Sequence, residues 1–297
     1  MNILQIEKQI SAIAALTEGC SIRATERLTG IHRDTIMRLG VRVGQGCAKL
    51  HNALMRDLHV DLIEVDEIWS YVGKKQRKLT KEDGTDKGDQ YTFTALDATS
   101  KAMIAYRVGK RDGDNTRAFA WDLRERITNV PMISSDAFPP YVQAIKDAFG
   151  DEVHYGQIVK KYAGEPGKDS ARRYSPGYVV AVERRAVHGK PVRFLTSTSY
   201  VERSNLTFRM QQRRFTRLTN GFSKKLKNHK AAVALFIAHY NFCRVHETIR
   251  VTPAMQLGVA DHIWTIGELV EAALHGSINE PEGKRVGPFR VIDGGVS

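Results

Sequence analysis

The order of strand-like and helix-like segments constrains the fold of this chain more than any other feature of its sequence. Apolar residues follow the pattern of buried or half-buried strands over five stretches, at 62–69, 91–96, 102–108, 131–135 and 153–159. Helical spacing occupies 112–127 and 139–149, and a short turn at 97–100 joins the second and third strands into a hairpin. A hairpin followed by strand–helix–strand crossovers predicts an α/β fold with a mixed sheet flanked by helices.

Three acidic residues, far apart in the sequence, fall at strand ends or on a later helix of this scheme. Asp66 belongs to the first strand, Asp136 ends the fourth, and Glu202 lies near the start of a helix predicted over 199–218. The first and fourth strands are expected to be neighbours, so the carboxylates can converge. Crowded carboxylates repel one another unless a cation is bound. Two divalent cations about 3.5–4 Å apart can activate a nucleophile and stabilise a leaving oxygen in phosphoryl transfer.

We therefore predict that Asp66, Asp136 and Glu202 are catalytic and metal-binding, and each has an alternative. Glu64 lies on the same face of the first strand as Asp66 and is a rival ligand. Asp136 is also placed to cap the following helix, a common role for aspartate. Glu202 stands in a first helical turn, where the helix dipole favours negative charge.

Residues 1–58 are expected to form a small all-α domain. Apolar spacing predicts two short helices before Gly30 and a third over 33–43, with a connector and a further helix over 44–60. Helix, tight glycine turn and helix is the helix-turn-helix pattern, whose second helix enters the DNA major groove. The outer face of the third helix carries the candidate DNA-binding residues Arg33, Thr35, Arg38 and Arg42. A plain helical lid is the alternative.

Positive charge is concentrated in one stretch of the chain. The net charge is +12, and residues 202–230 hold nine Lys or Arg side chains against one acid. A focused basic patch is the electrostatic footprint of phosphate binding, so we expect double-stranded DNA as the partner. The candidate phosphate-binding residues of this stretch are Arg209, Arg213, Lys224 and Lys225. A solvated basic surface is the alternative.

The catalytic domain is expected to span 59–278 and to contain an insertion. Residues 160–198 are rich in Lys and Arg and include a predicted β-hairpin strand at 179–182. This insertion is either a DNA-contacting arm or a solvated loop. An apolar helix is predicted over 229–243, and the Gly- and Pro-rich residues 279–297 are expected to be a disordered tail.

Several protein classes are excluded by composition. No run of about 18 apolar residues is present, so no membrane span is expected. The first residues lack the basic start, apolar stretch and cleavage site of a secretory signal. Three widely spaced cysteines and no CxxC pair argue for a reducing compartment and against a disulfide framework or a zinc ribbon. We expect a cytoplasmic protein.

The strings around these acids resemble the DDE transposases of bacterial insertion sequences, in particular the insertion-sequence-one family. The similar strings are 65–75, 135–141, 200–209, 213–217, 222–225, 240–246 and 252–255. The resemblance runs from residue 20 to residue 270. A D…D…E spacing alone is weakly specific, whereas the spacing together with these strings is specific.

The resemblance implies a ribonuclease-H-like core, whose order of elements this chain shares. It implies Mg²⁺, or Mn²⁺ in its place, held by Asp66, Asp136 and Glu202. The implied reaction is cleavage of element ends by water, followed by attack of the freed 3′-hydroxyl on target DNA. Because two ends must be brought together, we expect a homo-oligomer, a dimer or larger.

Two other functions stay open at this point. A non-catalytic DNA-binding repressor derived from a transposase would keep the basic patch without needing three carboxylates. A structure-selective nuclease of the same fold would cleave branched DNA without joining strands.

Overall fold

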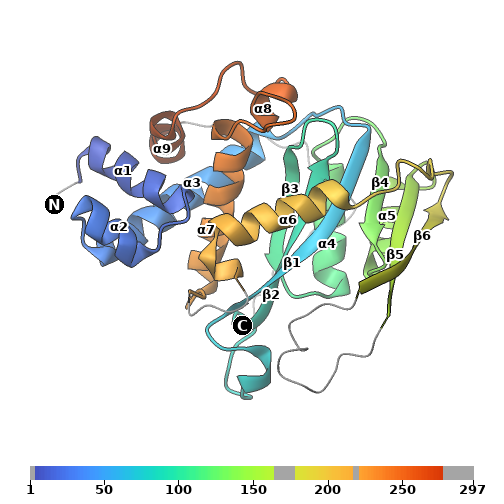
Figure 1. Ribbon diagram of the computed structural model, residues 1–297, viewed down its shortest axis with the longest axis horizontal. Helices are drawn as coiled ribbons and strands as arrows, with labels where there is room; N and C mark the ends of the chain where they lie inside the picture. The colour runs from blue at the N-terminus through green and yellow to red at the C-terminus, as the bar shows by residue number, and fades with distance from the viewer. Residues whose placement is uncertain (1–3, 164–177, 217–220, 277–297) are drawn as a thin grey trace, which may run out of the picture.

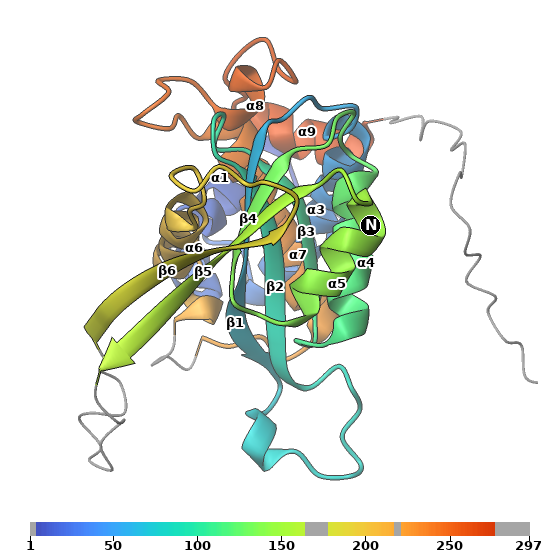
Figure 2. The ribbon, with the colours of Figure 1, turned by 90° about the vertical axis from the view of Figure 1, so that its right-hand side faces the viewer.

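The computed structural model describes residues 4–163, 178–216 and 221–276 and shows an α/β protein. A six-stranded mixed sheet runs through the molecule, with helices on both of its faces (Figure 1 and Figure 2). The predicted disordered tail at 279–297 lies outside the described residues. Within the described ranges, no helix is long and apolar enough to cross a membrane.

The sheet has the strand order β3-β2-β1-β4-β5-β6. The strands are β1 Leu62–Val72, β2 Gly88–Asp97, β3 Met103–Gly109, β4 Met132–Asp136, β5 His154–Ala163 and β6 Tyr178–His188. β4 is parallel to β1 and to β5, and the remaining neighbours are antiparallel. The predicted hairpin of β2 and β3, and the parallel strands that follow it, are therefore confirmed.

Helices cover both faces of the sheet. They are α4 Gly113–Arg124, α5 Pro140–Phe149, α6 Ser199–Gln211 and α7 Leu226–Ala238. On the α4–α5 face, Phe119 and Tyr141 are buried in one core with Phe93 of β2. On the α6–α7 face, Phe208 packs in a second core with Ile68 of β1 (Figure 2). Burial of apolar side chains on both faces holds the sheet between two helical layers.

The N-terminal helices share a third core with helices from the C-terminal half. The remaining helices are α1 Ile6–Thr17, α2 Ile22–Thr29, α3 Arg33–Leu54, α8 Pro253–Gln256 and α9 Ile266–His275. Ile13 and Val43 are fully buried together with Leu235 of α7 and Leu269 of α9. The core of the predicted 1–58 region is thus completed by residues far along the chain.

Two glycines allow α3 to lie directly against its neighbours. A Cβ atom at Gly44 would lie 2.1 Å from the carbonyl oxygen of Ala231 in α7, and one at Gly46 would lie 1.8 Å from that of Ala273 in α9. Any side chain at these positions would therefore force the helices apart. The backbone of α3 is wedged between α7 and α9.

The predicted break in the third helix is wrong. A helix over 33–43 and a connector with a further helix over 44–60 were expected, whereas α3 continues without interruption to Leu54. Glycine lowers helix propensity, which favoured the break. Burial of α3 against α7 and α9 outweighs that local preference.

The structure also corrects the predicted insertion at 160–198. Its first residues extend β5, and the strand predicted at 179–182 belongs to β6, which pairs antiparallel with β5 rather than with a later part of the insertion. The helix predicted over 199–218 ends at Gln211 and is followed by a 3₁₀ turn, Arg213–Phe215. The helix predicted over 229–243 begins earlier, at Leu226, and ends in a π turn, His239–Cys243.

Candidate active site

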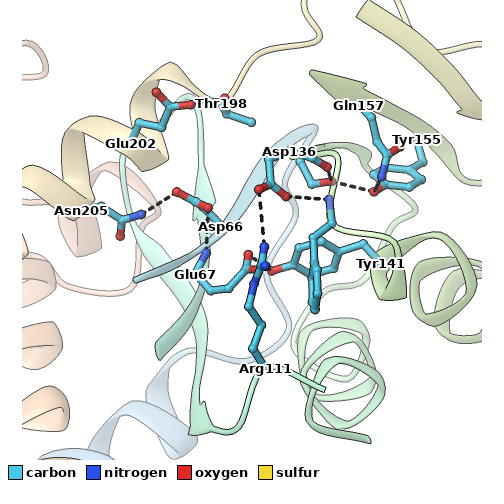
Figure 3. A network of polar contacts seen from close by, with 12 residues as sticks. Asp66, Glu67, Arg111, Asp136, Tyr141, Tyr155, Gln157, Thr198, Glu202 and Asn205 are labelled. Atoms are coloured by element: carbon cyan, nitrogen blue, oxygen red, sulfur yellow. Dashed lines mark hydrogen bonds and ion pairs between the residues drawn. The ribbon is translucent and has the colours of Figure 1, made fainter. Parts of the chain in front are cut away.

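The parallel pairing of β1 with β4 brings Asp66 and Asp136 together. Val65 lies opposite Ser135 in this pairing, so the next residue of each strand lies at the same level of the sheet. Figure 3 shows the Asp66 carboxylate between Asn205 of α6 and the Asp136 side chain. Asp136 ends β4 as predicted, whereas β1 continues to Val72, so Asp66 lies inside its strand rather than at its end.

Glu67 joins the two aspartates. Oxygen atoms of Asp66, Glu67 and Asp136 all lie within 4.8 Å of one another. Strand alternation places Glu67 on the opposite face of β1 from Asp66, and for that reason the sequence reasoning left it out. Its longer side chain returns to the same place from the α5 side, where Tyr141 Oη donates a hydrogen bond to Glu67 Oε2 at 3.2 Å. The position of Glu67 directly after Asp66 in the sequence is the signal that could have identified it.

Arg111 links two of the three carboxylates. Its Nε donates to Glu67 Oε1 at 2.5 Å, and its Nη2 lies 3.8 Å from Asp136 Oδ2. The guanidinium also lies over the ring of Phe138, 3.9 Å from the ring centroid. One protein cation therefore already offsets part of the negative charge.

Hydrogen bonds orient both aspartates. Asn205 Nδ2 donates to Asp66 Oδ2 at 2.7 Å, and the backbone N–H of Glu67 donates to Asp66 Oδ1 at 2.8 Å. Asp136 Oδ1 accepts a bond from the backbone N–H of Phe138 at 3.0 Å. Phe138 precedes α5, whose N-cap residue is Pro139 and which has no side-chain cap hydrogen bond, so the capping role considered as the alternative for Asp136 is wrong.

Burial and crowding disfavour the charged form of Asp66. Burial is the main cause that raises its pKa to about 7, and repulsion from Glu67, Asp136 and Glu202 adds to it. The pKa of Glu67 is also raised, first by burial and then by Asp136, although Arg111 opposes the change. A cation bound among these oxygens would restore the ionised form.

Glu202 lies on α6 close to Asp66 but is not a member of the group of three. Thr198, which lies beside Glu202 in Figure 3, donates from its Oγ1 to Glu202 Oε1 at 2.6 Å. Lys160 of β5 forms an ion pair with the same oxygen. The Glu202 side chain is 42% exposed. The structure thus brings Asp66 and Asp136 into contact with Glu67 and leaves Glu202 at the margin of the site.

The rival ligand Glu64 has a different role. Its Oε2 accepts hydrogen bonds from the backbone N–H groups of Tyr200 and Val201, at 2.8 and 2.9 Å. These are first-turn donors of α6, which have no partner within the helix. Glu64 is buried, so it fixes the start of α6 against β1 and thereby positions Asn205.

The predicted DNA-binding residues of the basic stretch occupy two surfaces. Arg213 and Lys224 line a pocket that also includes Arg33 from the start of α3. Lys225 lines a second groove, which lies beside the start of α7 and is also lined by Lys224. Arg209 is half-buried on α6. No local pattern in the sequence indicates that Arg33 and Arg213 line the same pocket.

The N-terminal candidates are arranged around a short turn. Gly30 ends α2 in the left-handed conformation, with φ 69°, and α3 begins three residues later. Arg38 is exposed on α3, whereas Thr35 is half-buried. Arg42 Nη2 donates to Gln9 Oε1 of α1 at 3.2 Å, so its guanidinium also serves the packing of α1 on α3.

The donor set suits a hard divalent cation. Carboxylate oxygens are the ligands that Mg²⁺ prefers, and Asp136 is 43% exposed, which leaves the cluster open to solvent on one side. No protein-family model matches the chain, and a search of curated proteins gave no match. The geometry of this cluster and the net positive charge of the chain are therefore the features that bear on function.

Proposed function

We propose that this chain is a metal-dependent DNA transposase of the DDE type, which cleaves element ends and joins the freed 3′-hydroxyl to target DNA. The observation that carries the proposal is the group of carboxylates from Asp66, Glu67 and Asp136 on neighbouring parallel strands, beside the helix that bears Glu202. The strand order is compatible with a ribonuclease-H-like core. A net charge of +12 fits a nucleic acid substrate.

Asp66 and Asp136 are the residues that would hold the divalent cation, Mg²⁺ or Mn²⁺. Their fit is supported by the raised pKa of Asp66, because a cation would offset the repulsion that contributes to it. When bound, such ions activate the attacking oxygen and stabilise the leaving oxygen of a phosphodiester. Glu202 of α6 would provide a further carboxylate ligand if its side chain left the ion pair with Lys160.

Neighbouring side chains prepare the aspartates for this role. Asn205 and the backbone N–H of Glu67 each bond one oxygen of Asp66, which restricts the rotation of its carboxylate. Arg111 and Tyr141 hold Glu67 in the same way. Ligands oriented by such partners bind a cation more tightly than free ones.

DNA recognition is assigned to the N-terminal helices and to the basic stretch. In the proposal, α2, the turn at Gly30 and α3 form a helix-turn-helix that binds element ends, with Arg33 and Arg38 facing outward. Because two ends must be synapsed, the active species would be a dimer or larger. A monomer in size-exclusion chromatography with paired-end DNA would contradict that part.

A strand-transfer assay tests the function. Labelled DNA that carries the sequence flanking this gene is incubated with the protein and Mg²⁺, and wild type is compared with Asp66→Asn. Joining that depends on metal and disappears in the variant, while DNA binding persists, is the expected result. Binding without chemistry in the wild type would favour the repressor, and cleavage without joining would favour the nuclease.

A further inference from the structure

A pocket of about 810 Å³ lies where the N-terminal helices meet the end of α6. Its walls come from the turn between α1 and α2, the first turns of α3, residues 211–214 and residues 221–228. α6 runs across the sheet from the carboxylate cluster toward this junction (Figure 1). The cluster therefore lies beside the first half of α6, where Asn205 bonds Asp66, and the pocket lies at the C-terminal end of the helix.

The lining of this junction pocket is strongly basic. Its charged side chains are five bases against one acid, namely Arg23, Arg33, Arg213, Arg214, Lys224 and Asp34. Among the ion pairs of the described residues, none involves any of these five bases. Cations that outnumber carboxylates in this way attract a polyanion and raise its local concentration.

Two polar groups in the lining are incompletely matched by the protein. Arg214 Nη1 donates to Ser223 Oγ at 3.0 Å and to the carbonyl of Asn228 at 3.1 Å, which are both neutral acceptors. Burial lowers the pKa of Arg214 to about 10, so it still carries its charge at neutral pH. Gln211 Oε1 is buried and has no hydrogen-bond partner among the described residues, but as an acceptor it does not bond a phosphate. The charge of Arg214, which is matched only by neutral acceptors, is the feature that favours an anion in this pocket.

The two walls of the pocket are held at a fixed distance. Gly19, in the turn between α1 and α2, has φ +83°, and a Cβ atom there would lie 2.9 Å from the carbonyl oxygen of Gln211. The turn therefore contacts the end of α6 directly. The turn and the end of α6 cannot separate without breaking this contact.

We propose that the junction pocket binds the phosphodiester backbone of a DNA strand about four to five nucleotides from the phosphate at Asp66 and Asp136. Asn205, which bonds Asp66, and Glu202 lie six and nine residues before the end of α6 at Gln211, and Arg213 lies two residues beyond that end. At a helical rise of about 1.5 Å per residue the helical part of this path is roughly 9–14 Å long, and the two further residues lengthen it by roughly 3 Å. One strand of duplex DNA advances about 3.4 Å per nucleotide, so this span is about four to five nucleotides. The spacing rests on the proposed function, whereas the backbone contact itself does not.

The first test measures binding without chemistry. A fluorescent duplex of mixed sequence is titrated with protein in EDTA over a series of salt concentrations, with wild type, Arg33→Gln and Arg213→Gln. Lys49→Gln is the matched control, because Lys49 is an exposed base of α3 outside the pocket lining. Each pocket variant is expected to weaken binding to DNA of any sequence. Each is also expected to lower, by about 1, the slope of the logarithm of the binding constant against the logarithm of the salt concentration. An equal effect in the control would overturn the proposal.

The second test locates the contact on the DNA. Single phosphates are replaced by neutral methylphosphonates along the strand that is cut, and binding is measured in the Asp66→Asn background. Wild-type side chains in the pocket should make binding sensitive about four to five nucleotides from the cut, and Arg213→Gln should remove that sensitivity. Sensitivity that persists in Arg213→Gln would contradict the assignment.

Failure of this inference and failure of the proposed function give different results. Pocket-dependent DNA binding without metal-dependent cleavage would refute the transposase and keep the pocket. Cleavage by wild type, together with unchanged DNA binding by Arg33→Gln and Arg213→Gln, would keep the transposase and refute the pocket. Displacement of the duplex by stoichiometric nucleoside triphosphate would show that the pocket serves a free nucleotide, and would overturn the DNA assignment.

Discussion

Arg111 and Lys160 show how single residues stabilise an acidic cluster without a metal. Arg111 contacts Glu67 and Asp136, and Lys160 contacts Glu202. Each offsets part of the repulsion that would otherwise oppose folding. A divalent cation among the same oxygens would take over much of that role.

This reasoning predicts a metal-dependent phenotype for Arg111→Gln. The substitution removes the guanidinium that offsets the negative charge of Glu67 and Asp136. Because the Arg111 side chain is 38% exposed, we expect the metal-free protein to lose only about 1–2 kcal/mol of unfolding free energy. Mn²⁺ should recover most of this loss. Urea unfolding with and without Mn²⁺ measures both effects, and a loss that Mn²⁺ leaves unchanged would refute the shared role.

The nearness of Asp66 to Asp136 was predictable from the sequence, whereas the positions of Glu67 and Glu64 were not. Asp66 and Asp136 were found because strand order makes their strands neighbours. Glu67 was missed because period-two alternation describes where a side chain starts and not where a long one ends. That Glu64 would bond the first turn of α6 depends on tertiary placement, which no local pattern encodes.

At the scale of elements, α3 is the clearest case of packing that overrides propensity. Three glycines at 40, 44 and 46 weaken the helix locally, yet Gly44 and Gly46 are what allow its close contact with α7 and α9. The N-terminal helices are thereby fixed to the layer that contains α6 and α7. An added side chain would disturb that connection.

Gly44→Ala is therefore expected to destabilise the protein strongly. A new Cβ atom 2.1 Å from the Ala231 carbonyl oxygen must displace a helix, and overpacking of this kind costs about 1–3 kcal/mol or more. Gly113→Ala is the control, since nothing lies within 4 Å of its Cβ position. Thermal unfolding should show a lower Tm for Gly44→Ala and little change for Gly113→Ala; similar Tm values for the two would refute the close contact.

The element boundaries that sequence could not give share a common cause. The strands at 62–69, 91–96 and 131–135 were placed correctly because their apolar patterns are local. β6 was assigned to an insertion hairpin because its pairing partner, β5, lies earlier in the chain. Pairing between distant segments leaves no trace in the spacing of either one.

At the scale of the whole molecule, two buried histidines link stability to pH. His51 lies among α3, β3 and Arg126, and His229 lies between Ser70 and Ser223. Burial, followed by a nearby arginine, lowers the pKa of each to about 3. Both rings therefore stay neutral in the folded protein while they protonate near pH 6.5 in the unfolded chain.

Stability should consequently fall as pH decreases from 6.5 toward 3, because the unfolded state binds protons that the folded state does not. Each histidine is expected to remove about 1.5 kcal/mol between pH 6.5 and 5. Asp66, with its raised pKa, acts in the opposite direction, so the comparison must be with a variant. His229→Gln should show a shallower decline in urea unfolding than wild type, and His275→Gln, at an exposed position at the end of α9, should not.

The architecture of the molecule was predictable in outline only. Element order predicted the mixed α/β sheet, and the charge pattern identified the stretch whose basic residues line the two pockets near the end of α6 and the start of α7. The core of the N-terminal helices includes residues of α7 and α9, and Arg33 lines the same pocket as Arg213. Both features depend on contacts between segments that are far apart in the chain. Such contacts are fixed by the packing of whole layers.

Metal binding by the carboxylate cluster is the central claim, and thermal unfolding with Mn²⁺ tests it most directly. Wild type, Asp66→Asn and Asp136→Asn are compared with Asp61→Asn, which removes an exposed acid just before β1. A ligand at about 100 times its Kd stabilises the folded state by about 2.7 kcal/mol. Wild type and Asp61→Asn should therefore rise in Tm, and the two site variants should not. An equal rise in all four proteins, or none in wild type, would contradict the account.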